Sequence, residues 1–143
     1  MLSIDTSDFL LQIRPVAMRR EEPGGPYLEW LDVWVRIEVP GIQAEGAWSV
    51  MPDELRGFLQ QLQTMHAQLR PDQRAELASV EAGFALSLQT LERGVITGDW
   101  RFQPSPPDGA CLTGHCGLDQ TYLHQWMQGI EPLLAFVPSN NSP

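Results

Sequence analysis

The chain has 143 residues, of which 43% are hydrophobic, and its 18 acidic residues face nine arginines and no lysine, for a net charge of −9. This size suits one globular domain, expected over residues 1–138, that buries its core without disulfides or metal, followed by a disordered tail over residues 139–143. The acidic surplus argues against nucleic acid as a partner, because binding its backbone needs clustered positive charge. No apolar run approaches 18 residues, and the start MLSIDTSDF lacks the basic region of a secretory signal. We therefore expect a cytoplasmic protein that does not span a membrane.

Alternation of apolar and polar residues predicts three strands in the first part of the chain. The first is expected from about Asp8 to Met18, ending near the sequence RREEPGGP. The second, LEWLDVWVRIEV over residues 28–39, has the clearest pattern, with Leu31, Val33, Val35, Ile37 and Val39 on one face and Trp30, Asp32, Trp34, Arg36 and Glu38 on the other. Pro40-Gly41 favours a turn, so a third strand is expected to return from it through Val50 as a hairpin.

The period then changes from two to about 3.6 residues, which predicts a helix over residues 52–69. Leu55, Phe58, Leu59, Leu62 and Leu69 recur at helical spacing. Pro52 suits the first turn of the helix, and Arg70-Pro71 is expected to end it.

In the second part of the chain, alternation returns from Ala75 to Leu88 and predicts one long bent strand, with a bulge at Gly83. A turn at residues 92–94 leads to a strand over VITGDWRFQ, and the proline-rich PSPPDG forms a loop before a strand over ACLTGHCGL. The last helix is expected over LDQTYLHQWMQGI, with Asp119 as N-cap, and to end at Glu131-Pro132. The order βββαβββα predicts an α+β domain with a curved, mostly antiparallel sheet of about six strands and two helices.

The stretch ACLTGHCGL holds both cysteines, Cys111 and Cys116, together with His115. A zinc site usually combines two close ligand pairs, whereas here only His66 or His124 could complete the set. Cys111 and Cys116 are five positions apart and would point to opposite faces of a strand. We therefore interpret the cysteines as small packing residues, with neither metal nor cofactor expected and a disulfide disfavoured in the cytoplasm.

The known catalytic signatures are absent: the sequence contains no GxGxxG, no phosphate-binding GxxxxGK(S/T) and no HExxH. Adjacent His115 and Cys116 would point apart in a strand, which does not suit a nucleophile and its base. We expect a protein that is not an enzyme. The alternative is a small-molecule-binding protein or an enzyme with an unrecognised site.

The polar face of residues 28–39, with the strand that returns from it, is the candidate binding surface. Its candidate partner-binding residues are Trp30, Asp32, Trp34, Glu38 and Glu45. The two tryptophans are either covered by a helix or sheet curvature, or exposed as anchors of the kind that protein interfaces use. Between Glu21 and Glu54 there are eight acids and one arginine, so this region either aids solubility or steers a basic partner.

Taken in order, the sequences EWLDVWVRIEV, AWSVMPDELRGFLQQL and GLDQTYLHQWMQGI, followed by AFVP, resemble small bacterial proteins of the WapI immunity type. That family carries a W-L-x-V-x-V strand, a W…EL…L helix entry and a terminal helix with a D-x-(S/T)-x-L motif before FP. Met51 stands where Ser or Thr is usual, and FP is split as Phe136-Val137-Pro138. The resemblance implies a protein that binds and neutralises a cognate secreted toxin domain, with no catalysis and no cofactor. A homo-oligomeric structural module is a third hypothesis.

Overall fold

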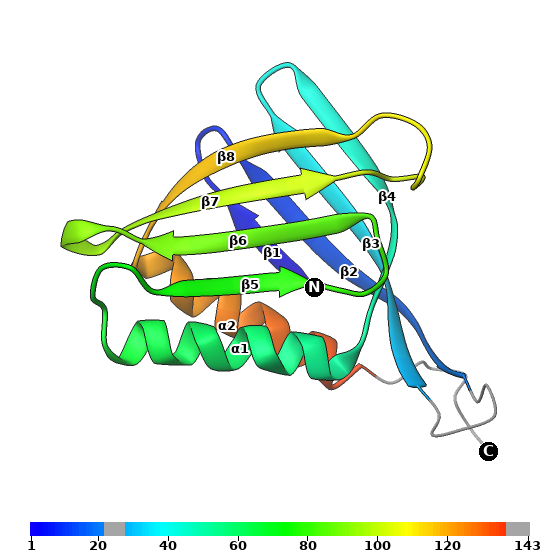
Figure 1. Cartoon of the computed structure of the whole chain (residues 1–143), viewed down its shortest axis with the longest axis horizontal. Coiled ribbons are helices and arrows are strands. Elements are labelled where there is room, and N and C mark those ends of the chain that lie inside the picture. Colours follow the sequence, from blue (N-terminus) through cyan, green and yellow to red (C-terminus); the bar gives the residue numbers. More distant parts are fainter. Residues whose placement is uncertain (22–27, 137–143) are drawn as a thin grey trace.

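The computed structural model describes residues 1–21 and 28–136, which form two four-stranded antiparallel sheets and two α-helices (Figure 1). The expected α+β class, the antiparallel pairing and the two helices are confirmed. The sequence RREEPGGP, near which the first predicted strand was expected to end, falls largely on residues 22–27. These residues, the expected tail at 139–143 and the residues Val137-Pro138 lie outside the described residues.

The first sheet, sheet A, is a meander in which each strand pairs with the next along the chain. Its strands are β1 (Leu2–Asp5), β2 (Leu10–Glu21), β3 (Leu28–Val39) and β4 (Ile42–Val50). Gly41 has a φ of 81° in the turn between β3 and β4, a conformation that glycine adopts without strain, so the expected hairpin is confirmed. The register between β2 and β3 shifts between Pro15 and Ala17, which places Val16 in a bulge.

Helix α1 (Pro52–Ala67) follows sheet A and confirms the predicted helix, although it ends two residues before the predicted end at residue 69, so Leu69 lies beyond the helix. Its buried face consists of Pro52, Leu55, Phe58, Leu62 and Met65. At its start, the backbone N–H of Met51 donates to Oε1 of Glu54 at 2.8 Å, so this carboxylate satisfies a donor at the helix entry.

The second sheet, sheet B, repeats the meander. Its strands are β5 (Arg74–Ala78), β6 (Phe84–Thr90), β7 (Val95–Phe102) and β8 (Leu112–Asp119), with a single 3-10 turn (Glu92–Gly94) between β6 and β7. The expected turn at residues 92–94, the strand after it and the proline-rich loop are confirmed.

Helix α2 (Thr121–Leu134) ends the described chain. The N-cap residue is Gln120, so the expected N-cap at Asp119 is wrong by one position. Oδ1 of Asp119 still accepts a hydrogen bond from the backbone N–H of Thr121 at 2.8 Å and so satisfies a donor at the helix start. The expected end at Glu131-Pro132 is wrong. The helix continues through Pro132 for two further residues, because a proline near the end of a helix removes one hydrogen bond while Leu133 gains burial in the core.

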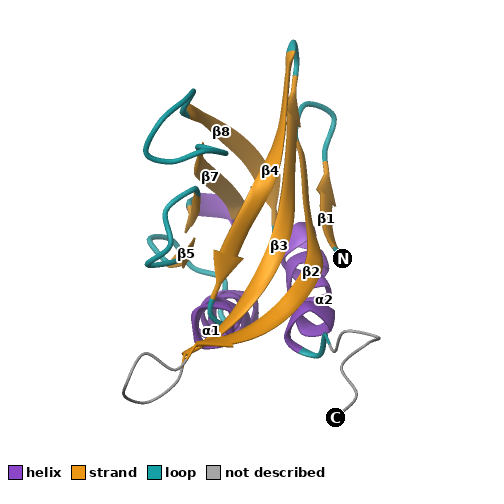
Figure 2. Cartoon of the chain, turned by 90° about the vertical axis from the view of Figure 1, so that its right-hand side faces the viewer, coloured by secondary structure: helices purple, strands orange, loops and turns teal. Residues whose placement is uncertain are grey.

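Each helix covers the edge of the sheet from the other half of the chain. Helix α1 lies beside β5 and α2 beside β1, and the two helices lie side by side at one end of the molecule (Figures 1 and 2). The backbone N–H of Glu76 in β5 donates to Oε1 of Gln61 in α1 at 2.8 Å. The free edges of β1 and β5 are thereby protected from pairing with another chain.

The inner faces of the two sheets share one hydrophobic core with the helices. Trp48 of β4 meets Phe84 of β6 edge to face, with ring centroids 5.2 Å apart. Phe58 of α1 meets Trp126 of α2 in the same way at 5.8 Å. These pairs join the two halves of the chain, because each contributes one ring from residues 1–67 and one from residues 84–126.

Two expectations about the strands are corrected. The described residues form eight strands in two sheets rather than about six in one, because β1 was not expected and the predicted strand from Ala75 to Leu88 is two strands, β5 and β6. The loop between β5 and β6 is held by Glu54 of α1, which accepts hydrogen bonds from Oγ of Ser79 at 2.7 Å and from the backbone N–H of Val80 at 3.1 Å. The expected bulge at Gly83 is therefore wrong, since Gly83 lies at the end of this loop with a φ of 137°.

Neither helix within the described residues has the length and apolar character needed to cross a lipid bilayer.

Candidate partner-binding surfaces

The outer face of sheet A carries the polar residues that the alternation of residues 28–39 predicted. Asp32, Trp34, Arg36 and Glu38 of β3 share this face, and Glu45 of β4 lies opposite Arg36 in the register. The core side of β3 consists of Leu31, Val33, Val35 and Ile37, each 2% exposed or less. The alternation and the grouping of Asp32, Trp34, Glu38 and Glu45 on one face are therefore confirmed, while their role in binding remains a prediction.

Arginines pair with the acids of this face. Nε of Arg19 in β2 lies 2.9 Å from Oδ1 of Asp32, which also accepts a hydrogen bond from Oγ of Ser49 at 2.6 Å. Nη2 of Arg36 lies 2.7 Å from Oε1 of Glu38. The acidic surplus between Glu21 and Glu54 is thus partly neutralised on this face, because Arg19 of β2 pairs with Asp32 and Arg36 of β3 pairs with Glu38. Locally, the outer face of sheet A carries mixed charge rather than a uniformly acidic surface.

Trp34 is held in a fixed orientation on this face. Its Nε1–H donates to Oε1 of Glu45 at 2.8 Å, and the side chain is partly exposed. Arg14 of β2 lies on its other side in the register. An aromatic ring that is already oriented loses little conformational freedom when a partner covers it, which makes Trp34 a suitable interface anchor.

Trp30 is covered rather than exposed. Only 6% of its surface is accessible, and the guanidinium carbon of Arg19 lies 5.4 Å from the centroid of its ring. Such stacking of a cation on an aromatic face is favourable and shields the ring from solvent. In this conformation the ring of Trp30 stacks on Arg19, which in turn pairs with Asp32, and Trp30 presents little of its own surface to a partner.

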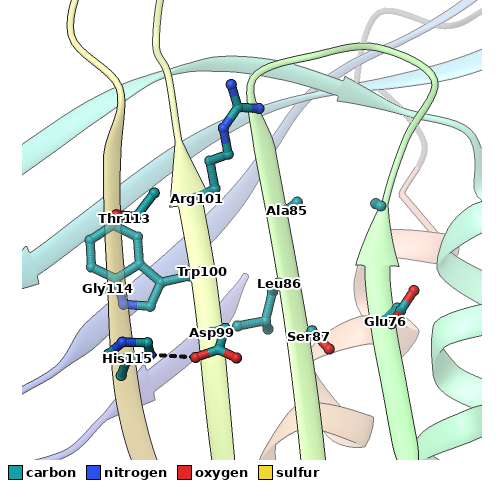
Figure 3. Close-up of a pocket in the computed structure, with 11 residues that line it drawn as sticks. Glu76, Ala85, Leu86, Ser87, Asp99, Trp100, Arg101, Thr113, Gly114 and His115 are labelled. Carbon is teal, nitrogen blue, oxygen red and sulfur yellow. Dashed lines mark hydrogen bonds and ion pairs between the residues drawn. The ribbon is translucent and has the colours of Figure 1, made fainter.

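A groove on the outer face of sheet B was not expected from the sequence. It has a volume of about 460 Å³ and lies over two rows of residues that cross the strands (Figure 3). The first row is Glu76, Ser87, Asp99 and His115. The second row is Ala78, Ala85, Arg101 and Thr113. The only sequence signal was the occurrence of small residues at outward positions of β5 and β6, and it gains meaning only when the register of four strands is known.

The order of residues in the first row decides what chemistry the groove can support. Asp99 lies between Ser87 and His115, and Nδ1 of His115 contacts Oδ1 of Asp99 (Figure 3). A hydrolytic triad needs the histidine between the carboxylate and the serine, so that the imidazole can take the serine proton. Here His115 is two strands away from Ser87, and this arrangement cannot activate the hydroxyl.

The ACLTGHCGL stretch forms β8 as expected, with its two cysteines in different environments. Cys116 and Leu118 are buried, at 7% and 6% exposure, whereas His115 points to the outer face. Cys111 precedes the strand and is exposed, so the interpretation as a packing residue holds for Cys116 only. The described residues contain no group of three or more His, Cys, Asp or Glu side chains placed to hold a metal ion.

The other two histidines lie together at the helix ends. His66 is in the last turn of α1 and His124 is near the start of α2, with ring centroids 6.5 Å apart. Both side chains are exposed.

The two thiols are expected to differ in reactivity. Burial, followed by the negative charges of Asp99 and Asp8, raises the pKa of Cys116 from the ordinary value of 9.0 to about 11. At pH 8, iodoacetamide should therefore modify Cys111 alone in the folded protein, and mass spectrometry should find one adduct per chain. Two adducts before unfolding would contradict the structure, and Cys111→Ser should leave no rapidly modified thiol.

The same shift has a consequence for stability. The folded-state pKa of Cys116 lies above the unfolded value, so the unfolded chain loses this proton first as pH rises. The contribution of the buried thiol to stability is complete below pH 9 and is lost between about pH 9 and pH 11.

The sequence matches the model of the immunity protein WapI-like family over residues 1–138. The chain belongs to the WapI-like immunity protein family. Comparison with curated proteins gave no match.

The motifs that pointed to the WapI-like family have structural roles in this chain. Nε1 of Trp48 donates to the backbone oxygen of Glu81 at 3.0 Å, and Glu54 joins the start of α1 to the same loop. Met51, which replaces the usual Ser or Thr, contributes only backbone groups, since its carbonyl oxygen accepts from the N–H of Glu54 at 2.9 Å. The motif residues of this WapI-like protein thus hold the fold together, and its partner-contacting residues have to be sought on the outer faces of the sheets.

Proposed function

We propose that the protein is a cytoplasmic immunity protein that neutralises a cognate toxin domain by binding it, without catalysis or a cofactor. Membership of the WapI-like immunity family over residues 1–138 is the observation that carries this proposal. The groove on sheet B, where a serine, an aspartate and a histidine lie in one row, lacks the order that a hydrolytic triad needs, which also favours a binding role.

We further propose that the toxin contacts the outer face of sheet A through Asp32, Trp34, Glu38 and Glu45. Support comes from the oriented ring of Trp34 and from the ion pairs around it, which fix the charged side chains before binding. A surface ordered in advance loses less conformational entropy on association. The mixed local charge calls for a partner surface with alternating charges rather than a uniformly basic one.

The net charge of −9 would act at longer range. A strongly negative protein attracts a basic partner before contact, and this raises the association rate at low salt. Short-range contacts on sheet A would then set the dissociation rate.

The test needs the cognate toxin domain, which is first sought among the genes that neighbour the gene for this protein. Wild-type protein is expected to restore growth of cells that express the toxin domain and to bind it in surface plasmon resonance. Trp34→Ala should weaken binding at least about 30-fold, mainly through faster dissociation, because a central aromatic anchor contributes on the order of 2 kcal/mol or more. The association rate of the wild type should fall as NaCl rises from 50 to 300 mM.

Thr97→Ala, on the outer face of sheet B and outside the groove, is the matched control and should bind as the wild type does. Unchanged affinity of Trp34→Ala would overturn the assignment of the contact surface. A wild-type protein that neither binds the toxin domain nor protects cells would overturn the proposed function itself.

A further inference from the structure

The groove on sheet B is made by a local lack of side-chain bulk. The outward side chains of β5 and β6 at its centre are Ala78, Ala85 and Ser87. Larger side chains border them, with Glu76 at one end of the first row and Asp99 beyond Ser87. Neighbouring strands lie about 4.8 Å apart, so the backbones of Glu76 and Asp99, two strands apart, are about 10 Å from each other across Ser87. The volume of about 460 Å³ is large enough for a long side chain and part of its backbone.

The carboxylates that border the groove have free oxygens. His115 contacts Oδ1 of Asp99, and the other oxygen of Asp99 points toward the Ser87 side (Figure 3). Glu76 is exposed, and its carboxylate accepts no hydrogen bond from any other described residue. Two acceptor groups therefore flank a gap that no side chain of the described residues fills.

The second row of the groove has the opposite charge. Arg101 lies next to Ala85 in the register, and its Nη2 is 3.4 Å from Oε1 of Gln103, a neutral partner. The groove thus favours an occupant that has a positive group over Ser87 and a backbone carbonyl or an acidic group near Arg101 and Thr113. The groove thus has polarity as well as shape.

We propose that this groove is a docking site for an arginine side chain of a partner protein. The aliphatic stem would lie on Ala78 and Ala85, and the guanidinium group would lie over Ser87 between Glu76 and Asp99. Arginine suits the site because its planar group carries five N–H donors and can bond two carboxylates at once, whereas a lysine ammonium is a compact point charge. The site is on a different sheet from the proposed toxin surface and does not depend on it.

Nuclear magnetic resonance titration with blocked arginine, N-acetyl-arginine methylamide, tests the proposal. We expect shifts of backbone amides in β5 to β8 around Glu76, Ser87 and Asp99, with a dissociation constant on the order of millimolar, as suits one exposed side chain with two ion pairs. Blocked citrulline, which has nearly the same shape but no charge, should bind at least about tenfold more weakly.

Three variants separate binding in the groove from general attraction to a negative protein. Glu76→Gln combined with Asp99→Asn should weaken arginine binding at least about fivefold, whereas Glu92→Gln, an exposed acid outside the groove, should not change it. Ala85→Leu should fill the groove and abolish the shifts while circular dichroism stays as in the wild type. Equal binding of arginine and citrulline, equal loss in the two carboxylate variants, or shifts that map to sheet A would overturn the proposal. Toxin binding with no arginine shifts would leave the proposed function intact and remove this site.

Discussion

Trp126→Ala is expected to lower the free energy of unfolding by about 3–5 kcal/mol, the range observed when a large aromatic side chain is removed from a core. The side chain is fully buried in α2 and packs edge to face on Phe58 of α1, with an angle of 88° between the rings. Urea unfolding followed by far-ultraviolet circular dichroism measures the loss without relying on tryptophan fluorescence.

Gln125→Ala is the matched control, since Gln125 is the exposed neighbour on the same helix, and it should change stability by no more than about 0.5 kcal/mol. Trp126→Phe should cost less than half as much as the alanine variant, because phenylalanine keeps the ring contact and removes an indole N–H that has no hydrogen-bond partner among the described residues. A loss below about 1 kcal/mol in Trp126→Ala would mean that α2 does not pack on α1 as described.

The position of Trp126 also predicts how the molecule unfolds. The ring links α2, which follows sheet B, to α1, which follows sheet A, and α2 itself lies against β1. The edge of sheet A is therefore covered by α2, and the edge of sheet B by α1, so each half of the chain depends on the helix of the other half. We infer that the two ββββα halves form one cooperative unit despite their repeated order.

The spacing of apolar residues predicted the strands and helices whose buried face is recorded in their own sequence. The alternation of residues 28–39 and the helical spacing from Leu55 to Leu62 record which side chains face the core, and both appear in the structure. The four-residue β1 was too short to show a period, although Leu2 and Ile4 are fully buried. Short edge strands are defined by their neighbours rather than by their own sequence.

The division of the predicted Ala75–Leu88 strand had no local signal. Residues 78, 80, 82 and 84 continue the apolar alternation through a segment that is a loop, and Val80 in that loop is 78% exposed. The loop is stabilised by hydrogen bonds to Glu54, a residue more than twenty positions earlier. Tertiary contacts of this kind override a two-residue period, and a single sequence does not reveal them.

The candidate surface was predictable in position but not in charge. The alternation placed Asp32 and Glu38 on the outer face correctly, whereas their pairing with Arg19 and Arg36 depends on the register between strands and on side-chain conformation. The groove on sheet B needed the register of all four strands and was missed entirely. The sequence thus predicts well which face of a strand a side chain lies on. Which side chains of neighbouring strands lie together on that face can be predicted only when the register between the strands is known.

Gly114→Ala is expected to destabilise the protein by about 1–3 kcal/mol, the usual cost of overpacking a core. A Cβ on Gly114 of β8 would lie 2.4 Å from Cζ2 and 2.6 Å from Cε2 of Trp100 on β7. Trp100 cannot move aside easily, because it is only 5% exposed and packs near Phe9, with ring centroids 6.3 Å apart. The absence of a side chain at position 114 is thus what allows the indole ring to lie flat across β8. Thermal unfolding and urea unfolding both measure the effect.

Gly117→Ala provides a control with the same chemistry in the same strand. A Cβ at Gly117 would have no atom within 4 Å, so the variant should be neutral or more stable by up to about 1 kcal/mol, because alanine loses less conformational entropy than glycine on folding.

Trp100→Leu should remove most of the penalty when it is combined with Gly114→Ala, since the double mutant lacks the ring that the new methyl group meets. Equal effects of the two alanine variants, or a penalty that persists in the double mutant, would show that β8 tolerates a side chain over Trp100. Asp99 of β7 and His115 of β8 belong to the groove, so a shift of the indole ring in Gly114→Ala would disturb the groove from its inner side. This variant should therefore weaken blocked-arginine binding, whereas Gly117→Ala should not.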